Sequence, residues 1–266
     1  MNLYKGKKER IPMKATFKSL LKKGDRFIGT YVSFPADDML EVMKLAGMDF
    51  IILDMEHDQL TLREVMSMIR TCDACGLATM VRVPSLNETM IRKVLDMGAS
   101  AVKVPDIHNA EEARQAVDYA KYPPMGVRGA CPYVRGNGYG TDKIHCYEQA
   151  NQETAVSVII EGLDGIAHME EIIATPGIDS VSVGNIDLAV ALGVPGQTFH
   201  PKVIEAVKEC ARLCEKYGKT CSAQVRTAED AREFDGYPGI SHFHVEFPPY
   251  VLYKGYKTLC DGLKQE

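Results

Sequence analysis

Phe50-Ile-Ile-Leu53, followed at once by Asp54-Met-Glu-His57, is the stretch that decides the fold of this 266-residue chain. An unbroken apolar run that ends abruptly in polar residues is typical of a strand buried on both faces of a parallel sheet. The run at 62–72 then has the spacing of an amphipathic helix. A buried strand followed directly by a helix is the repeating unit of parallel α/β folds.

The same strand–helix unit recurs from one end of the chain to the other. After a leading helix at 17–21, we expect strands at 27–32, 50–53, 79–83, 101–104, 156–160, 180–183, 220–224 and 242–245. Helices are expected between them, for example at 39–46, 62–72, 111–120, 203–216 and 228–234. Eight such units predict one α/β domain over 1–266, a (β/α)8 TIM barrel with an extra N-terminal helix. An open dinucleotide-binding sheet is less favoured, because no Gly-x-Gly-x-x-Gly follows an early strand.

The composition argues against several classes of protein. A net charge of -5, with only short basic clusters at 5–10 and 22–23, argues against nucleic-acid binding. The chain begins without the apolar core of a secretory signal, and no stretch is apolar over the length of a membrane span. Among the eight cysteines, the pairs at 72/75 and 210/214 fall on predicted helices, which favours buried thiols over disulfides or zinc. We expect a cytoplasmic protein.

One connection is longer than the repeat requires. Residues 122–151 contain three prolines and five glycines. A connection of this length in a compact fold is usually functional or mobile, which makes the segment a candidate lid.

The polar residues after the second strand are the first candidates for catalysis, because active sites of parallel barrels lie at the carboxyl ends of the strands. Asp54, Glu56 and His57 place three titratable groups within four positions. A histidine titrates near neutrality, and a carboxylate can fix its tautomer, so the group suits a base with an orienting acid. A solvated loop start fits the spacing equally well.

Arg82 lies inside the apolar run of the third strand. A buried guanidinium requires an anion, which is either a substrate carboxylate or enolate oxygen, or a structural ion pair within the barrel.

Two carboxylates follow neighbouring strands. Glu161 comes directly after the fifth strand, and Asp187 follows the sixth. Oxygen ligands suit hard divalent cations such as Mg²⁺ or Mn²⁺, and two carboxylates are enough for an open catalytic site. The alternative is that Asp187 only caps the next helix.

Six pieces of sequence occur together in order: Ala46-Gly-Met-Asp-Phe-Ile-Ile-Leu-Asp-Met-Glu-His57, Val81-Arg-Val-Pro84, Leu95-Asp-Met-Gly98, Lys121-Tyr-Pro-Pro-Met-Gly-Val-Arg-Gly129, Ile160-Glu161 and Gly184-Asn-Ile-Asp187. With these pieces the chain resembles, from Gly29 to about Ile240, the HpcH/HpaI aldolases. That family consists of metal-dependent pyruvate aldolases that act on 4-hydroxy-2-oxo-heptanedioate and 2-keto-3-deoxy sugar acids. The resemblance implies reversible cleavage of a 4-hydroxy-2-oxo acid to pyruvate and an aldehyde.

The resemblance also implies roles for single residues. His57 matches the catalytic histidine, with Asp54 as the carboxylate that orients it. Arg82 matches the arginine that binds and polarises the 2-oxo group. Glu161 and Asp187 match the ligands of a divalent cation, which is Mg²⁺, Mn²⁺ or Co²⁺.

Two further positions concern the substrate and the assembly. The Gly184-Asn185-Ile186 loop corresponds to the family's substrate-binding loop, although small residues are usual where this chain has Asn185 and Ile186. Asp96 matches an acidic residue that enters a neighbouring subunit's active site, so the resemblance implies a homo-oligomer, a trimer or hexamer. Ile159 stands where the family usually has a glutamine, and the last strand reads His242-Phe-His-Val-Glu-Phe-Pro-Pro249 where a Gly-x-Asp is expected.

Three other functions are alternatives to a metal-dependent aldolase. Lys103, inside the fourth strand, is a candidate for a Schiff-base aldolase, because desolvation makes a lysine amine nucleophilic. An acyl-CoA lyase shares the metal–enolate chemistry, but the sequence has no basic nucleotide site. A barrel that only binds ligands is the non-enzymatic alternative.

Overall fold

The computed structural model describes residues 15–57 and 59–264. Eight parallel strands form a closed barrel in sequence order, each hydrogen-bonded to the next and β8 to β1. The strands are β1 (Phe27–Val32), β2 (Phe50–Asp54), β3 (Ala78–Arg82), β4 (Ala101–Val104), β5 (Ala155–Ile160), β6 (Ser180–Val183), β7 (Thr220–Gln224) and β8 (Ile240–His244). The predicted (β/α)8 barrel is confirmed.

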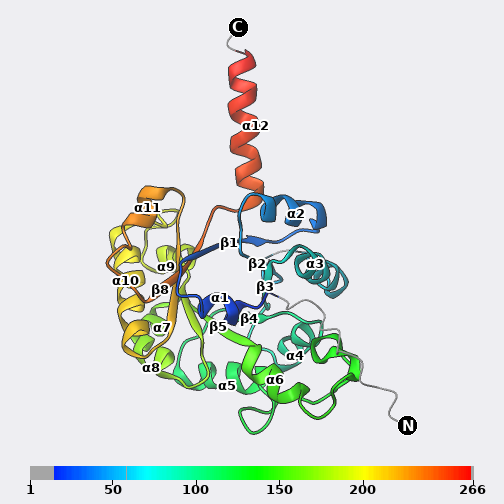
Figure 1. Ribbon diagram of the computed structural model, residues 1–266. Coiled ribbons are helices and arrows are strands. Elements are labelled where there is room, and N and C mark those ends of the chain that lie inside the picture. Colours follow the sequence, from blue (N-terminus) through cyan, green and yellow to red (C-terminus); the bar gives the residue numbers. More distant parts are fainter. Residues whose placement is uncertain (1–14, 58, 265–266) are drawn as a thin grey trace, which may run out of the picture.

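Helices surround the barrel (Figure 1). They are α1 (Phe17–Leu21), α2 (Asp37–Leu45), α3 (Leu62–Cys75), α4 (Glu88–Asp96), α5 (Ala110–Ala120), α6 (Cys146–Glu153), α7 (Leu163–Ala167), α8 (Met169–Ala174), α9 (Asn185–Ala191), α10 (Pro201–Lys216), α11 (Ala228–Arg232) and α12 (Pro248–Lys264), with a 3-10 turn, η1 (Arg135–Gly140). Side-chain caps begin several of them, as where Thr61 accepts a hydrogen bond from the Glu64 amide in a capping box.

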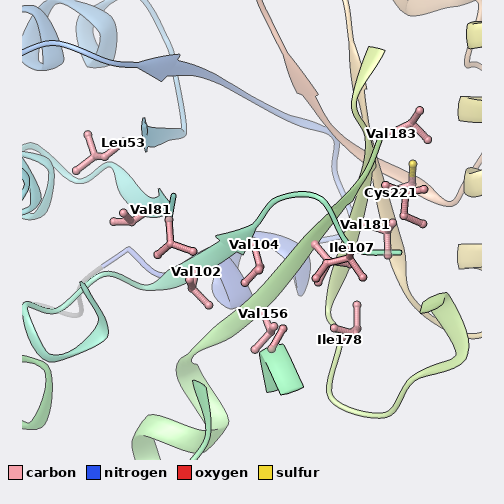
Figure 2. Packing of buried hydrophobic residues seen from close by; sticks show 14 of the residues in the cluster. Leu53, Val81, Val102, Val104, Ile107, Val156, Ile178, Val181, Val183 and Cys221 are labelled. Carbon is pink, nitrogen blue, oxygen red and sulfur yellow. The ribbon is translucent and has the colours of Figure 1, made fainter. Parts of the chain in front are cut away.

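Alternating side chains of the strands build two separate cores. The outward-facing ones pack against the helices, and Figure 2 shows part of this layer, including Val81, Val102, Val156 and Val181. The inward-facing ones at the amino end of the barrel pack around Phe17 of the predicted N-terminal helix α1. The Phe17 ring meets those of Phe27 and Phe50 edge-on, with ring centroids 5.4 Å apart in each pair. Helix α1 therefore closes the end of the barrel opposite the carboxyl ends of the strands.

Small differences in strand bounds matter for the site. β2 continues to Asp54 and β3 ends at Arg82, whereas the sequence predicts ends one residue earlier and one residue later. Asp54 and Arg82 are register partners. The final polar residue of each strand therefore points into the same end of the barrel.

The segment 122–151 does not lie where a lid for this chain's own site would lie. It follows α5 and precedes β5, so it runs at the amino ends of the strands, which is the wrong end for the predicted lid. There it packs against α4: Arg135 donates a hydrogen bond to the Met97 carbonyl, and a Cβ on Gly136 would lie 2.3 Å from the Leu95 carbonyl oxygen. A helix-to-strand connection always returns to the amino end of a parallel sheet, which the composition of the loop could not reveal.

Helix α12 stands out from the barrel (Figure 1). From Pro249 to Lys264 every residue of the helix is exposed. Within the described residues, none of the helices combines the length and apolarity needed to cross a membrane. All eight cysteines are free thiols, as expected, and six of them lie on α3, α6, α10 and β7.

Candidate active site

A cavity of about 530 Å³ opens at the carboxyl ends of the strands. This volume is in the range of small-molecule sites. Eight of the nine candidate site residues line it, and Asp96 does not. Its lining includes Tyr31, Asp54, His57, Arg82, Glu161, Ser182, Gly184, Asn185, Ile186, Asp187, Ser222, Gln224 and His244.

Arg82 is held by two carboxylates. Its Nε donates to Asp54 Oδ1 at 2.8 Å, its Nη2 lies 2.5 Å from Asp54 Oδ2, and its Nη1 lies 2.9 Å from Glu56 Oε2. These contacts raise the pKa of Arg82, so the guanidinium stays charged. A guanidinium has five N–H groups, and two of them donate hydrogen bonds here, both to Asp54, while the contact with Glu56 is an ion pair. N–H groups therefore remain to meet a substrate oxygen, so the structural and the substrate-binding interpretations of Arg82 are compatible.

The aromatic ring of Tyr31 contacts the same guanidinium. The Arg82 guanidinium lies over the Tyr31 ring, with its carbon 4.8 Å from the ring centroid. Burial raises the pKa of Tyr31, so its hydroxyl stays protonated. The Tyr31 ring and the two hydrogen bonds to Asp54 together fix the plane of the guanidinium.

His57 lies beside Glu56 rather than Asp54. Its Nε2 is 3.7 Å from Glu56 Oε2, while both Asp54 oxygens face Arg82. Burial raises the pKa of Glu56, against the lowering effect of Arg82. The His57 side chain is 61% exposed at the cavity rim. The carboxylate nearest to His57 Nε2 is therefore that of Glu56, to which sequence reasoning gave no role, and not that of Asp54, which was expected to orient the histidine.

Glu161 is a buried carboxylate that directly follows β5. The Asp106 amide donates to its Oε1 at 2.8 Å. Burial, together with the charges of Glu56 and Asp187, raises the pKa of Glu161 to about 7. Glu161 thus sits among like charges, in a place that a cation would stabilise.

Gly184 leaves the space that Glu161 occupies. A Cβ at Gly184 would lie 2.5 Å from both Cβ and Oε2 of Glu161. The absence of a side chain at this position therefore lets the β6–α9 loop pass directly beside the carboxylate.

Replacing Gly184 with Ala should displace the Glu161 carboxylate and lower kcat/KM by about a hundredfold, the cost of an ångström-scale misplacement. Steady-state kinetics with saturating Mn²⁺ would measure this loss. Gly162→Ala is the matched control, because a Cβ there meets nothing within 4 Å. An active Gly184→Ala enzyme would show that the position of Glu161 does not matter.

Asp187 stands in the first turn of α9, together with Asn185 and Ile186, which the sequence placed in a loop; the helix begins directly after Gly184. Asp187 lines the same cavity as Glu161. The Asn185 side chain is buried and donates to the Thr198 carbonyl at 3.1 Å, so it fixes this turn. The first amides of a helix have no partner within it, which leaves those of this turn able to bind a substrate carboxylate.

The donor set fits a divalent cation held by few protein ligands. Within the described residues, no group of three or more His, Cys, Asp or Glu is arranged to hold a metal ion. Glu161 and Asp187 line one cavity and would supply two carboxylate ligands, with water and substrate oxygens completing the shell, as Mg²⁺ often requires. The raised pKa of Glu161 supports the fit, because a cation would neutralise this buried charge.

Asp96 lies outside this cavity, at the end of α4. It accepts a hydrogen bond of 2.6 Å from Arg128, whose guanidinium lies over the Tyr122 ring at 4.5 Å. Its predicted part in an active site would have to concern the site of another copy.

Sequence reasoning missed the polar residues of the far wall. Strands β6, β7 and β8 line the cavity with four polar residues, which form its polar wall: Ser182, Ser222, Gln224 and His244. The available signal was alternation along the strands, since Ser180 and Ser182 share one face of β6, as do Ser222 and Gln224 on β7.

This cavity, lined by carboxylates and a guanidinium, lies at the carboxyl end of the barrel, where enzymes of this fold have their active sites. The model of the HpcH/HpaI aldolase/citrate lyase family matches residues 28–235. The chain belongs to this family, and the prediction that it is an aldolase is confirmed.

Characterised relatives agree with this membership. A hydroxypyruvate/pyruvate aldolase of Sagittula stellata is 35% identical over 77% of this chain and 81% of its own. A 5-keto-4-deoxy-D-glucarate aldolase of Klebsiella pneumoniae is 34% identical over 82% of this chain and 85% of its own. Among solved structures, an HpcH/HpaI aldolase from Desulfitobacterium hafniense superimposes with a TM-score of 0.88 at 25% identity, covering 95% of this chain and 98% of that one.

Proposed function

We propose that this aldolase binds a 2-oxo acid between Arg82 and a divalent cation held by Glu161 and Asp187, and cleaves or forms the bond to its C3. The observation that carries the proposal is the arrangement of charge in one cavity: a fixed guanidinium on β3 and two carboxylates after β5 and β6. A planar 2-oxo acid offers two oxygens to a cation and one to an arginine.

The cation, which is Mg²⁺, Mn²⁺ or Co²⁺ in this proposal, would act as a Lewis acid toward the enolate that both directions of the reaction share. Arg82, already oriented by Asp54, would donate a free N–H group to the enolate oxygen. Such fixed donors stabilise developing charge without reorganising. The first backbone N–H groups of α9, from Asn185 to Asp187, would hold the carboxylate of the 2-oxo acid.

His57 would act as the base of the reaction in both directions. In cleavage it would accept the proton of the C4 hydroxyl, directly or through water, as an aldehyde leaves and the pyruvate enolate remains. In synthesis it would accept a proton from the pyruvate methyl group. Glu56 would hold the imidazolium, since it is the carboxylate nearest to His57 Nε2.

The donor substrate of the proposal is pyruvate or a C3-substituted pyruvate. The Sagittula relative is named for hydroxypyruvate and pyruvate. The Klebsiella relative is named for a keto-deoxy sugar acid. The eight free thiols support a reducing compartment, the cytoplasm, as the place of the reaction.

Exchange of the pyruvate methyl protons tests the proposal without any knowledge of the aldehyde. In D₂O with Mn²⁺, the methyl signal of pyruvate should disappear in an enzyme-dependent way, and EDTA should stop the loss. NMR follows the signal directly. Exchange that continues in EDTA, or no exchange with any divalent metal, would contradict the metal–enolate proposal.

The geometry gives less support to a Schiff base at Lys103. Its amine is fully buried, donates to Ser182, and does not line the cavity. A carbonyl carbon in the cavity would meet Ser182 first. Borohydride in the presence of pyruvate should therefore leave the mass of the protein unchanged.

The exposed α12 supports the proposed homo-oligomer. Leu252, Tyr256, Leu259 and Leu263 fall at i, i+4, i+7 and i+11 and are all at least 42% exposed. Such a stripe is typical of a helix that packs on another surface. Burying each large apolar side chain is worth about 1.5–3 kcal/mol, which favours packing on a second copy.

Light scattering after gel filtration would measure the assembly. The full chain should run as a trimer or larger, and Leu259→Glu should shift it toward the monomer by placing a charge in the buried stripe. Thr258→Glu, at the adjacent position outside the stripe, should leave the assembly intact. A monomeric wild-type chain would overturn the oligomer proposal.

A further inference from the structure

A second cavity lies at the other end of the barrel from the candidate active site. It has a volume of about 670 Å³, and α3, the turn after α4, η1 and the end of α6 contribute to its walls. Ser100 and Thr154, which directly precede β4 and β5, also line it, so it lies at the amino ends of the strands. This amino-end cavity shares no lining residue with the active-site cavity. The proposed reaction therefore does not use it.

Three arginines line the amino-end cavity. Arg70 comes from α3, and Arg128 and Arg135 come from the connection between α5 and β5. Arg135 is engaged, because it donates to Asp73 Oδ2 at 2.5 Å and to the Met97 carbonyl at 3.2 Å. Arg70 is exposed, and within the described residues no ion pair joins it to a carboxylate. The cavity thus has a cation that this part of the chain does not neutralise.

Arg128 is the buried cation of the amino-end cavity. Its side chain is buried, and its Nη2 donates to Asp96 Oδ1 at 2.6 Å. Within the described part of the chain this is the one hydrogen bond that the guanidinium donates, although it has five N–H groups, and its buried Nε has no acceptor there. An unsatisfied buried donor of a charged group is costly. An anion with several oxygens in the cavity would therefore stabilise this arginine.

Asn137 and Glu153 bring hydrogen-bond acceptors to the same cavity. Asn137 is buried, and its amide nitrogen donates to the Tyr122 hydroxyl and the Cys131 carbonyl, while its Oδ1 accepts no hydrogen bond from the described residues. Glu153 is the last residue of α6. An anionic group cannot satisfy these oxygens, but a hydroxyl group can donate to either of them. The lining therefore suits a ligand that carries both an anionic group and hydroxyl groups.

The η1 turn that carries Asn137 has an unusual backbone. Tyr139 has a φ of 56° and Gly138 has a φ of 70°, and the left-handed region is uncommon for an aromatic residue. Such conformations persist where the surroundings hold them, and they cluster at ligand sites. Arg135, at the start of the turn, is bound to α3 through Asp73. The turn is thus held in place without a ligand.

We propose that the amino-end cavity binds a phosphorylated polyol, a small molecule that combines a phosphate monoester with hydroxyl groups. The phosphate would lie between Arg70 and Arg128, because its three terminal oxygens can accept from two guanidinium groups on different walls. The hydroxyl groups would donate to Asn137 and Glu153.

A phosphate fits these arginines better than a carboxylate. Arg128 and Arg135 already have one carboxylate each, from Asp96 and Asp73. A further carboxylate offers two oxygens in one plane, whereas a phosphate offers a third oxygen in another direction. Because the cavity is separate from the active site, this ligand would be an effector and not a substrate. The inference does not rest on the proposed function.

Calorimetry on the full chain tests the site with compounds that cannot be substrates. Glycerol 3-phosphate and sorbitol 6-phosphate carry a phosphate and hydroxyl groups but no carbonyl group. In EDTA, at least one of them should bind about tenfold more tightly than inorganic phosphate, because its hydroxyl groups add hydrogen bonds to Asn137 and Glu153. Sorbitol without the phosphate should not bind. Mn²⁺ together with pyruvate should leave the affinity unchanged, because the two cavities share no residue.

Variants of three arginines assign the binding to the cavity. Arg70→Gln removes the exposed cation and should weaken binding about tenfold. Arg63→Gln is the matched control, because Arg63 is an exposed arginine of the same helix that does not line the cavity, and it should keep full affinity. Arg128→Lys keeps the charge beside Asp96 but loses the planar fork, and it should weaken binding about tenfold or more. Thermal unfolding would confirm that each variant is folded.

Three results would overturn the site. The first is that neither phosphate ester binds more tightly than inorganic phosphate. The second is equal affinity of Arg70→Gln and Arg63→Gln, which would show attraction to the surface charge in general. The third is displacement of the ester by Mn²⁺ and pyruvate, which would place it in the active-site cavity. A failure of pyruvate proton exchange, by contrast, would concern the proposed function alone.

Discussion

Replacing Glu161 with Gln should abolish metal-dependent turnover and at the same time stabilise the metal-free protein. The amide keeps the shape of the side chain but loses its charge. Mn²⁺ affinity should fall by more than about a hundredfold, because even a hydrogen-bond partner of a ligand is worth ten- to a hundredfold. Calorimetry with Mn²⁺ and the pyruvate exchange rate would measure the two losses.

The stability gain follows from the raised pKa of Glu161, which is about 7 where an unperturbed glutamate has a pKa of 4.5. Below pH 4.5 the carboxyl is protonated in both the folded and unfolded chain, so no charge is buried and folding has no added electrostatic cost. Between pH 4.5 and 7 the unfolded chain releases the proton first, and the cost grows to about 3 kcal/mol above pH 7. Glu161→Gln removes this cost, so its advantage in urea unfolding should appear only above about pH 4.5.

A surface substitution provides the control for this prediction. Glu171→Gln on α8 makes the same chemical change at an exposed position. It should alter neither Mn²⁺ affinity nor unfolding. A Glu161→Gln protein that binds Mn²⁺ normally would remove Glu161 from the metal site.

The fold was readable because each of its strands is an apolar run with a polar end. Five strand starts and the N-terminal helix lie where the spacing predicts them, and the others differ by one or two residues. Short runs such as Ala101–Val104 suffice, because a strand buried on both faces needs no polar alternation. The barrel closure follows from eight such units.

Part of the site was readable for the same reason, since strand ends converge. The sequence alone could not predict which of the charged side chains at the strand ends contact one another. Asp54 and Arg82 meet because β2 and β3 are in register at these residues, and this pairing leaves His57 to Glu56. The polar wall was missed because serines in an apolar strand resemble ordinary small core residues.

Replacing Arg82 with Met should cost both stability and activity. The change leaves Asp54, which is 1% exposed, and Glu56 without their cation. Breaking a buried ion pair from one side costs about 3–5 kcal/mol. Losing the donor to the enolate oxygen should cost about a hundred- to a thousandfold in kcat, as other donors to a developing oxyanion do. Urea unfolding and steady-state kinetics would measure the two effects.

A second substitution separates these two effects. Arg82→Met combined with Asp54→Asn removes the more deeply buried of the two orphaned charges, while the amide still accepts the Glu56 backbone hydrogen bond that Asp54 accepts. The double variant should recover most of the stability and none of the activity. If activity returned together with stability, Arg82 would be a structural partner of Asp54 alone, and the enolate would need another donor. Because the guanidinium is charged at every accessible pH, the kcat loss itself should not vary between pH 6 and 9.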